Sequence, residues 1–330
     1  MRYLGSKTLL LENIAYLIEN YHQSTFCDPF GGIGTVGSYM KTKGYKVLSG
    51  DLLNFAHCFQ VALIELNEMP QFKNVAIEIG TGDLEQFLNK QKTETGWLIE
   101  EYARKRKFFT IENAQKIQGC INCINKWKSL KLLQDGEYEI LVASLIQSFD
   151  KVANTAGTYY AYLKEYYRKA KNPFKFSFLH PISGMEGCRA YLGDAKTLVK
   201  KSNADILYLD PPYNERNYSR YYHLPENISL GICPIPSGKS GVYVYQERES
   251  AYNKKLKATE AFEELITLAN AQCIIFHYTD NGLIKPQDAR DILLKKGRIE
   301  EFYFDCKGYS TISSGKKSQQ IGRASCSERV

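Results

Sequence analysis

Four consecutive residues, Asp210-Pro211-Pro212-Tyr213, have the types and order needed to grip a planar ring that bears an amino group. They follow the apolar run 204–209, which predicts a short buried strand. The two prolines end that strand, because neither can donate to a neighbouring strand and each fixes its own φ. The Asp210 carboxylate and a prolyl carbonyl can accept hydrogen bonds from an exocyclic amino group, while Tyr213 stacks on the ring. An ordinary strand-to-loop stop is the alternative for this motif taken alone.

A glycine-rich turn near the start of the chain predicts a ligand site. Residues 25–37 indicate strand, turn and helix, and the turn contains Gly31, Gly32 and Gly34. Glycine permits positive φ and close approach of a ligand, and amides at the next helix start point outward. The spacing is neither that of the dinucleotide motif nor that of the phosphate loop. A tight strand-to-helix turn without a ligand is the alternative.

Two acids follow further short strands. Asp51 ends the second predicted strand, 17 positions after Gly34, where nucleotide-binding folds hold ribose hydroxyls. Its alternative role is to cap the predicted helix 55–66. Asp194 can accept a hydrogen bond from an adenine amino group or cap the predicted helix 195–201.

The N-terminal motif Arg2-Tyr3-Leu4-Gly5-Ser6-Lys7 precedes an amphipathic helix. Ser6 and Lys7 near a helix start can bind a carboxylate. Alternatively, Ser6 is an N-cap and Lys7 is solvated.

In this order, the motifs resemble the adenine-specific DNA methyltransferases of the Dam-like, D12 class. The resemblance covers roughly residues 1–68 and 190–312. It implies a Rossmann-like α/β methyltransferase sheet and methyl transfer from S-adenosylmethionine to a flipped adenine in double-stranded DNA, without a metal. It assigns catalysis to Asp210, Pro211, Pro212 and Tyr213. To the cofactor it assigns Tyr3, Gly5, Lys7, Asp28, Pro29, Phe30, Gly31, Gly32, Gly34, Asp51 and Asp194.

We expect residues 1–69 and 186–320 to form the catalytic domain and residues 70–185 to form a mainly helical target-recognition insert. The net charge of +7 and the pI near 8.7 permit nucleic-acid binding without requiring it. Cations interleaved with aromatic residues are typical of DNA contacts, although solvated helix faces have the same pattern. The candidate DNA contacts are Arg104, Lys105, Arg106, Lys107, Arg168, Lys169, Arg216 and Arg220.

After the catalytic motif we expect a loop over 225–241, helices over 252–269 and 286–296, and strands over 273–278 and 299–306. A final hairpin is expected within 309–318. The last ten residues, 321–330, have no strand pattern and read as a non-native tail, so the sequence predicts no strand there.

Nine scattered cysteines, an odd number, indicate reduced thiols in a cytoplasm, here bacterial or phage-related. Cys120-x-x-Cys123 reads as helix core. No 18-residue apolar run predicts a membrane span.

The resemblance also implies a restriction-modification setting with a cognate endonuclease as a partner. Rival hypotheses are the same chemistry on cytosine N4, on RNA adenine or on a glutamine amide, and a DNA-binding relative that has lost catalysis. Asp210 favours adenine, and the complete motif favours an active enzyme.

Overall fold

The chain forms two compact units, each built from three segments. The computed structural model describes residues 1–21, 24–243, 249–279, 282–305 and 319–326. The helical unit comprises Met1–Ser6, Leu53–Ile182 and Tyr218–Glu247. The sheet unit comprises Lys7–Leu52, Ser183–Asn217 and Arg248–Val330.

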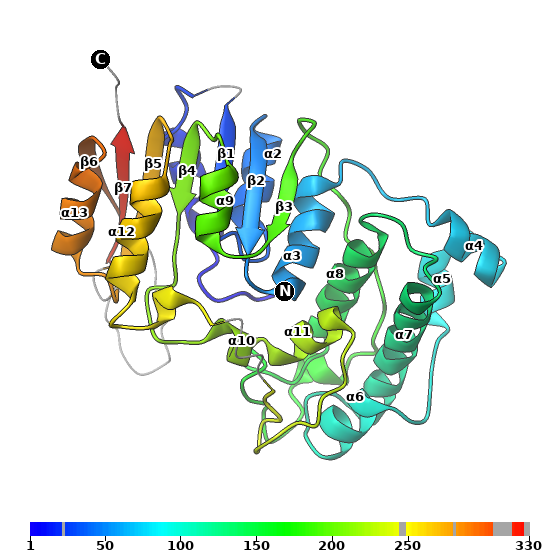
Figure 1. Ribbon diagram of the computed structural model, residues 1–330. Helices are drawn as coiled ribbons and strands as arrows, with labels where there is room; N and C mark the ends of the chain where they lie inside the picture. Colours follow the sequence, from blue (N-terminus) through cyan, green and yellow to red (C-terminus); the bar gives the residue numbers. More distant parts are fainter. Residues whose placement is uncertain (22–23, 244–248, 280–281, 306–318, 327–330) are drawn as a thin grey trace. The chain divides into compact units, whose positions relative to one another are not determined.

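The sheet unit is built on one seven-stranded sheet of order β3-β2-β1-β4-β5-β7-β6 (Figure 1). Its strands are β1 (Thr25–Asp28), β2 (Lys46–Asp51), β3 (Arg189–Leu192), β4 (Ile206–Leu209), β5 (Cys273–Thr279), β6 (Arg298–Asp305) and β7 (Gln319–Cys326). The first five run parallel to one another, whereas β7 runs antiparallel to both β5 and β6. This arrangement confirms the predicted α/β fold with a largely parallel sheet.

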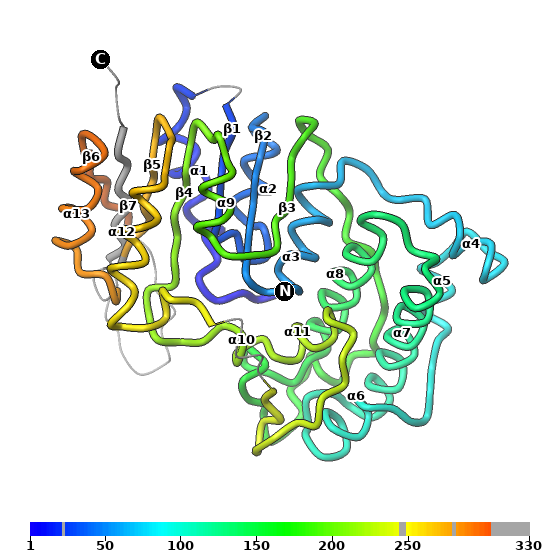
Figure 2. The backbone as a smooth tube through the Cα atoms, viewed as in Figure 1, coloured from blue at the N-terminus to red at the C-terminus, as the bar shows by residue number. Residues whose placement is uncertain are grey.

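Helices cover both faces of the sheet. Helices α1 (Leu11–Tyr16) and α2 (Thr35–Thr42) lie on one face, and α9 (Ala195–Lys201), α12 (Ala258–Leu268) and α13 (Pro286–Leu294) lie on the other (Figure 2). Right-handed crossovers between parallel strands require this division, because the chain moves along the sheet in opposite directions on the two sides of β1.

The core of the sheet unit explains why its central strands are apolar. All four residues of β4 are buried, as expected for a parallel strand covered on both faces. Beneath α12, the Phe262 and Phe276 rings pack with centroids 4.5 Å apart. Each such buried side chain stabilises the fold by about 1.5–3 kcal/mol.

Strand β7 was not expected, and the prediction of no strand after residue 320 was wrong in this respect. The backbone from Gln319 to Cys326 pairs with β5 on one edge and with β6 on the other. A strand between two neighbours forms hydrogen bonds along both edges whatever its side-chain pattern, so an apolar pattern is not required. The hairpin predicted within 309–318 lies outside the described residues.

Two further boundaries differ from the predictions. Helix α11 (His223–Leu230) occupies the start of the predicted loop. Pro225 lies in its first turn, where a missing N–H leaves no helical hydrogen bond unmade. Helix α12 begins at Ala258 because a separate 3-10 turn, Ala251–Asn253, precedes it.

The helical unit contains nearly all of the predicted helical insert. Its helices are α3 (Asn54–Gln60), α4 (Lys73–Ile79), α5 (Leu84–Asn89), α6 (Trp97–Ile99), α7 (Ile111–Ser129), α8 (Glu137–Asp150), α10 (Tyr218–Tyr221) and α11. Two π-helical turns, Val61–Glu65 and Glu100–Arg104, continue α3 and α6. Cys120 is buried in α7, as expected for a helix-core residue.

The helical unit also takes in residues 1–6, 53–69 and 218–247, which the sequence places in the catalytic domain. The reason lies in the start of α3. The Glu226 carboxylate of α11 accepts hydrogen bonds from the amides of Asn54 and Phe55, at 3.1 and 3.0 Å. Helix α3 also packs against α8 and α11, so its contacts lie within this unit.

Among the helices of the described residues, none combines the length and the apolar character needed to cross a membrane.

A buried histidine makes the helical unit sensitive to acid. The His223 ring is fully buried, and its Nε2 donates to the Tyr159 carbonyl at 2.9 Å. Burial lowers the pKa of His223 from an ordinary value near 6.5 to about 4. The unfolded chain therefore takes up a proton first as the pH falls.

We predict that His223 contributes stability above pH 6.5 that is lost as the pH falls to about 4, by roughly 3 kcal/mol. The free energy of unfolding of wild type and of His223→Gln, measured by urea titration across this range, checks the prediction. The variant should show a shallower pH dependence. Equal slopes would contradict the assignment.

Candidate active site

Four acids lie at one edge of the sheet. Asp28 and Asp51 are the last residues of β1 and β2, and Asp210 directly follows β4. Asp194 lies two residues after β3. Because these strands are parallel, their carboxyl ends meet at the same edge, beside the point where the strand order reverses at β1 and β4. The acids predicted from the motifs therefore follow strand ends at the same edge of the sheet.

Asp210 is held by an ion pair with Lys7. The Lys7 Nζ lies 2.5 Å from Asp210 Oδ2, and the two side chains are 4% and 16% exposed. The same ammonium lies 5.9 Å from the centre of the Tyr213 ring. Lys7 is therefore not a solvated lysine, and the structure pairs it with the predicted catalytic carboxylate.

The second oxygen of Asp210 has no such partner. Asp210 Oδ1 is buried, and within the described part of the chain it forms no hydrogen bond. An unsatisfied buried carboxylate oxygen is costly unless a donor arrives from a ligand. The corner formed by Asp210-Pro211-Pro212-Tyr213 can therefore accept one hydrogen bond from a ligand, at Asp210 Oδ1.

Asp28 is a buried acid beside this pair. It is 1% exposed, and its Oδ1 accepts a hydrogen bond from the Phe30 amide at 3.2 Å. Burial, together with repulsion from Asp210, raises the pKa of Asp28 to about 8. Asp28 therefore carries a proton at neutral pH, which relieves its repulsion from Asp210.

The glycine turn is shaped by Asp51. Gly32 and Gly34 have φ of 52° and 80°, which favour glycine, and Gly34 begins α2. Asp51 Oδ2 accepts a hydrogen bond from the Gly32 amide at 3.1 Å, and the Gly31 amide donates to the Gly50 carbonyl at 2.9 Å. Asp51 does not cap α3, whose first amides bond to Glu226. It orders the turn on which a ligand would rest.

Asp194 forms the helix cap that was its alternative role. Its Oδ1 accepts from the Lys196 amide at 2.9 Å at the start of α9. A contact with a nucleotide base stays a prediction for this residue. Two residues after the end of β1, Phe30 meets the buried Tyr252 edge to face, with centroids 4.9 Å apart.

Tyr3 and Gly5 belong to the helical unit. The Tyr3 ring stacks on Tyr222 at 5.1 Å, and the Leu4 amide donates to the Tyr222 hydroxyl at 2.8 Å. Gly5 has a φ of 81°. The assignment of Tyr3, Gly5 and Pro29 to the cofactor stays a prediction.

Two contacts that position the catalytic corner were missed by sequence reasoning. The Asn253 side-chain amide donates to the carbonyls of Asn214 and Arg216, both at 2.9 Å, and so braces the segment after the motif. The Leu283 amide donates to the Tyr213 carbonyl at 3.1 Å. No local pattern signals these bonds, because the partners lie about 40 or more residues apart in the chain.

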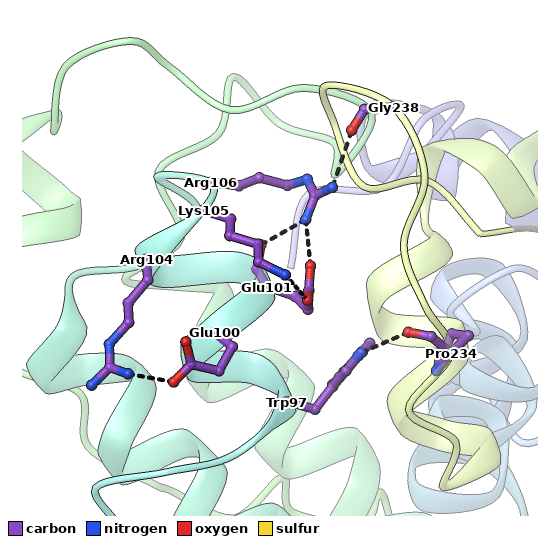
Figure 3. A network of polar contacts seen from close by, with 8 residues as sticks. All are labelled: Trp97, Glu100, Glu101, Arg104, Lys105, Arg106, Pro234 and Gly238. Carbon is purple, nitrogen blue, oxygen red and sulfur yellow. Dashed lines mark hydrogen bonds and ion pairs between the residues drawn. The ribbon is translucent and has the colours of Figure 1, made fainter.

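The predicted DNA-binding cations have several different environments. Lys105 lies 2.5 Å from Glu101, and Arg104 pairs with Glu100 (Figure 3). Lys107 donates to the Lys164 carbonyl at 3.0 Å, and Lys169 donates to the Asp150 carbonyl at 3.3 Å. The exposed members are Arg104, Lys105, Lys107, Arg168, Arg216 and Arg220.

Arg106 differs from the others. Its side chain is 11% exposed and pairs with Glu101 at 2.8 Å. The guanidinium also donates to the Gly238 carbonyl at 3.1 Å (Figure 3). Because these partners occupy both terminal nitrogens of the guanidinium and the side chain is largely buried, Arg106 is better explained as a structural residue than as a phosphate contact.

Within the described residues, no group of three or more His, Cys, Asp or Glu side chains is placed to hold a metal ion. The groups that are present suit an organic ligand. Asp51 and the glycine turn can receive ribose hydroxyls, and the free oxygen of Asp210 can receive an amino group.

Comparison with known proteins gives matches over most of the chain. The family described as D12 class N6 adenine-specific DNA methyltransferase matches residues 3–291. Similar proteins include Type II methyltransferase M.FokI of Planomicrobium okeanokoites, 35% identical over 97% of this chain and 50% of that protein. Modification methylase StsI of Streptococcus sanguinis is 33% identical over 89% of this chain and 46% of its own length.

A third relative has a similar length to this chain. Type II methyltransferase M.NlaIII of Neisseria lactamica is 32% identical over 91% of this chain and 90% of that protein. In contrast, the chain spans about half the length of the first two relatives.

We predict that the sheet unit becomes less stable as the pH rises, because the buried Asp28 carboxyl then loses its proton beside Asp210. Its raised pKa means that stability is present below about pH 4 and is lost as the pH rises to about 8. Asp28→Asn removes this titration and keeps the acceptor for the Phe30 amide. Thermal unfolding of both proteins at about pH 5 and about pH 8 tests this. The variant should gain stability relative to wild type at the higher pH, and a constant difference would refute the prediction.

Proposed function

The chain belongs to the D12 class of N6 adenine-specific DNA methyltransferases, and from this premise we propose that it transfers a methyl group from S-adenosylmethionine to adenine N6 in double-stranded DNA. The observation that carries the proposal is the state of Asp210. Oδ2 is paired with Lys7, and Oδ1 is buried and receives no hydrogen bond from the described residues. An adenine amino group is a donor of the required kind.

Asp210 and Pro211 activate the amino nitrogen of adenine, which is a weak nucleophile. The lone pair of the amino nitrogen is delocalised into the ring, so it attacks poorly. Hydrogen bonds from the amino group to Asp210 Oδ1 and to the Pro211 carbonyl localise that pair and stabilise the positive charge that develops during attack. One well-placed group of this kind typically contributes about 3–4 kcal/mol to the transition state.

Lys7 positions the carboxylate for this role. With Oδ2 fixed at 2.5 Å from the ammonium, the Asp210 carboxylate cannot turn freely, and Oδ1 keeps its direction. The ion pair also compensates the Asp210 charge next to the buried Asp28. This role differs from the contact with the cofactor carboxylate that the resemblance assigns to Lys7.

The cofactor supplies an electrophilic methyl group on a sulfonium, so the chain itself needs no metal or covalent intermediate. Asp51, Asp194 and the glycine turn would hold its nucleoside part at the ends of β1, β2 and β3. The remaining task of the site is to align the reacting atoms.

A paired adenine is out of reach, so the base must leave the helix at a cost of a few kcal/mol. Tyr213 can recover part of that cost by stacking on the base. Its backbone is fixed by the bond from the Leu283 amide. The exposed cations Arg216 and Arg220 follow closely in the chain and are proposed to contact phosphates, as are Arg104, Lys105, Lys107, Arg168 and Lys169.

The names of the relatives support a biological setting. Two are Type II methyltransferases and one is a modification methylase. We therefore propose that the chain acts in a restriction-modification system in a bacterial or phage-infected cytoplasm, with a cognate endonuclease as a partner. Cytosine N4, RNA and an inactive relative are the competing outcomes of the tests below.

Asp210→Ala should reduce methyl transfer at least about 100-fold, because it removes the acceptor of the nucleophile. Labelled methyl transfer to plasmid DNA, followed by mass analysis of the nucleosides, measures the rate and identifies the base. Cofactor affinity by calorimetry should stay within a few-fold of wild type. Asp135→Ala, in an exposed turn of the helical unit, is the matched control. Near-wild-type transfer by the Asp210 variant would refute the catalytic role.

Lys7→Met separates a positioning role from a cofactor contact. If Lys7 acts through Asp210, kcat should fall by roughly 10–100-fold, as expected for loss of a hydrogen bond to a charged group, with little change in cofactor affinity. The double variant with Asp210→Ala should then be no worse than Asp210→Ala alone. A large loss of cofactor affinity in Lys7→Met would instead support the carboxylate contact.

A further inference from the structure

The 234–241 loop of the helical unit is held at three backbone carbonyls. Trp97 Nε1 donates to the Pro234 carbonyl at 2.8 Å, and the Arg106 guanidinium donates to the Gly238 carbonyl at 3.1 Å (Figure 3). The buried Tyr102 hydroxyl donates to the Gly241 carbonyl at 2.9 Å. All three donors lie between Trp97 and Arg106, so one short segment fixes both ends and the middle of the loop.

The loop packs closely on Arg106. Gly241 has a φ of 68°, and a Cβ added there would lie 2.7 Å from Arg106 Nε. The loop also closes on itself, because Ser237 pairs with Val242 and the Ser237 hydroxyl donates to the Val242 carbonyl at 3.1 Å. These contacts give the loop a defined backbone on the surface of the unit.

Three side chains on this fixed backbone are exposed, those of Ile235, Ser237 and Lys239. Ile235 is 91% exposed, and Lys239 is also exposed. Single exposed apolar residues are common and need no explanation by themselves. Here, however, the exposed residue is presented by backbone held through buried or half-buried tryptophan, tyrosine and arginine side chains. Such preorganisation favours binding, because little order is lost when a partner arrives.

The charge around the loop indicates which partner fits. The holding segment, Trp97 to Arg106, and the loop carry four cations, Arg104, Lys105, Arg106 and Lys239. Against these four stand only two acids, Glu100 and Glu101, which leaves a net charge of +2. A cationic surface with one prominent apolar side chain complements a polyanion with apolar groups in its grooves, which describes a DNA duplex.

We propose that the 234–241 loop is a DNA-contact element in which Lys239 binds a backbone phosphate, Ile235 makes an apolar contact with a base edge, and Arg106 positions both. This proposal rests on the proposed function, since it takes DNA as the substrate. It assigns Arg106 the role of supporting the loop, in place of the direct DNA contact that the sequence predicts for this residue.

Steady-state methylation with wild type and with Ile235→Ala tests the apolar contact. The KM for cognate DNA should rise about tenfold, which corresponds to one good base contact, while kcat and cofactor affinity stay within about twofold. Ile77→Ala is the matched control, because Ile77 is 81% exposed in the same unit. It should leave the KM unchanged. An unchanged KM in Ile235→Ala would overturn the apolar contact.

Lys239→Gln tests the phosphate contact. The dependence of log Kd on log salt, measured by fluorescence anisotropy with labelled duplex, should become shallower by about one unit. Lys90→Gln, another exposed lysine of the helical unit, should keep the wild-type slope. A wild-type slope in Lys239→Gln would remove this residue from the interface.

Arg106→Gln tests the positioning role. It should raise the KM for DNA at least as much as Ile235→Ala does, and the double variant should show no rise beyond that of Arg106→Gln, because Arg106→Gln already removes the apolar contact. Additive effects would contradict the role. Gly241→Ala, which pushes the loop away from Arg106, provides a second test if Arg106→Gln does not fold. An unchanged KM in Gly241→Ala would also count against the proposal.

If wild type fails to methylate DNA, the proposed function fails. If wild type methylates DNA but the loop variants keep its KM and salt slope, only this inference fails.

Discussion

The site depends on keeping carboxylates together at one edge of a parallel sheet. Parallel strands bring Asp28, Asp51 and Asp210 to the same end, where like charges raise one another's energy. The structure resolves this repulsion in two ways. Lys7 compensates Asp210 at 2.5 Å, and Asp28 remains protonated in its buried position. As a result, Asp210 is paired with a cation instead of a second buried charge, and one of its oxygens keeps a fixed direction.

The surrounding elements hold the site through backbone contacts rather than through a dense set of side-chain bonds. Asp51 shapes the glycine turn through the Gly32 amide, and Asn253 braces the segment after the catalytic motif through two carbonyls. In the helical unit, Arg106, Tyr102 and Trp97 fix the 234–241 loop in the same way. Side chains that bond to loop carbonyls leave the outward-facing side chains of those loops available to ligands.

Much of this could be predicted from the sequence, and the exceptions have physical causes. The strand before Asp210 and the glycine turn were predictable because apolar runs, prolines and glycines act locally. The pairing of Lys7 with Asp210 joins residues that lie 203 positions apart, so it depends on tertiary structure. The sequence predicts a loop from Pro225 onward, whereas Pro225 lies in the first turn of α11, where proline is tolerated. Arg106 has the sequence context of a surface cation, and only its burial reveals its structural partners.

The place of β7 in the sheet has a consequence for how the chain is assembled. In the described sheet, β6 bonds to β7 alone, and β7 separates β6 from β5. During synthesis, β6 therefore emerges before the strand that must connect it to the growing sheet. Until β7 arrives, β5 has an open edge, which is a surface prone to pairing with other chains. Completion of this edge must then be among the late steps of folding, after the strands that carry the four acids have already been made.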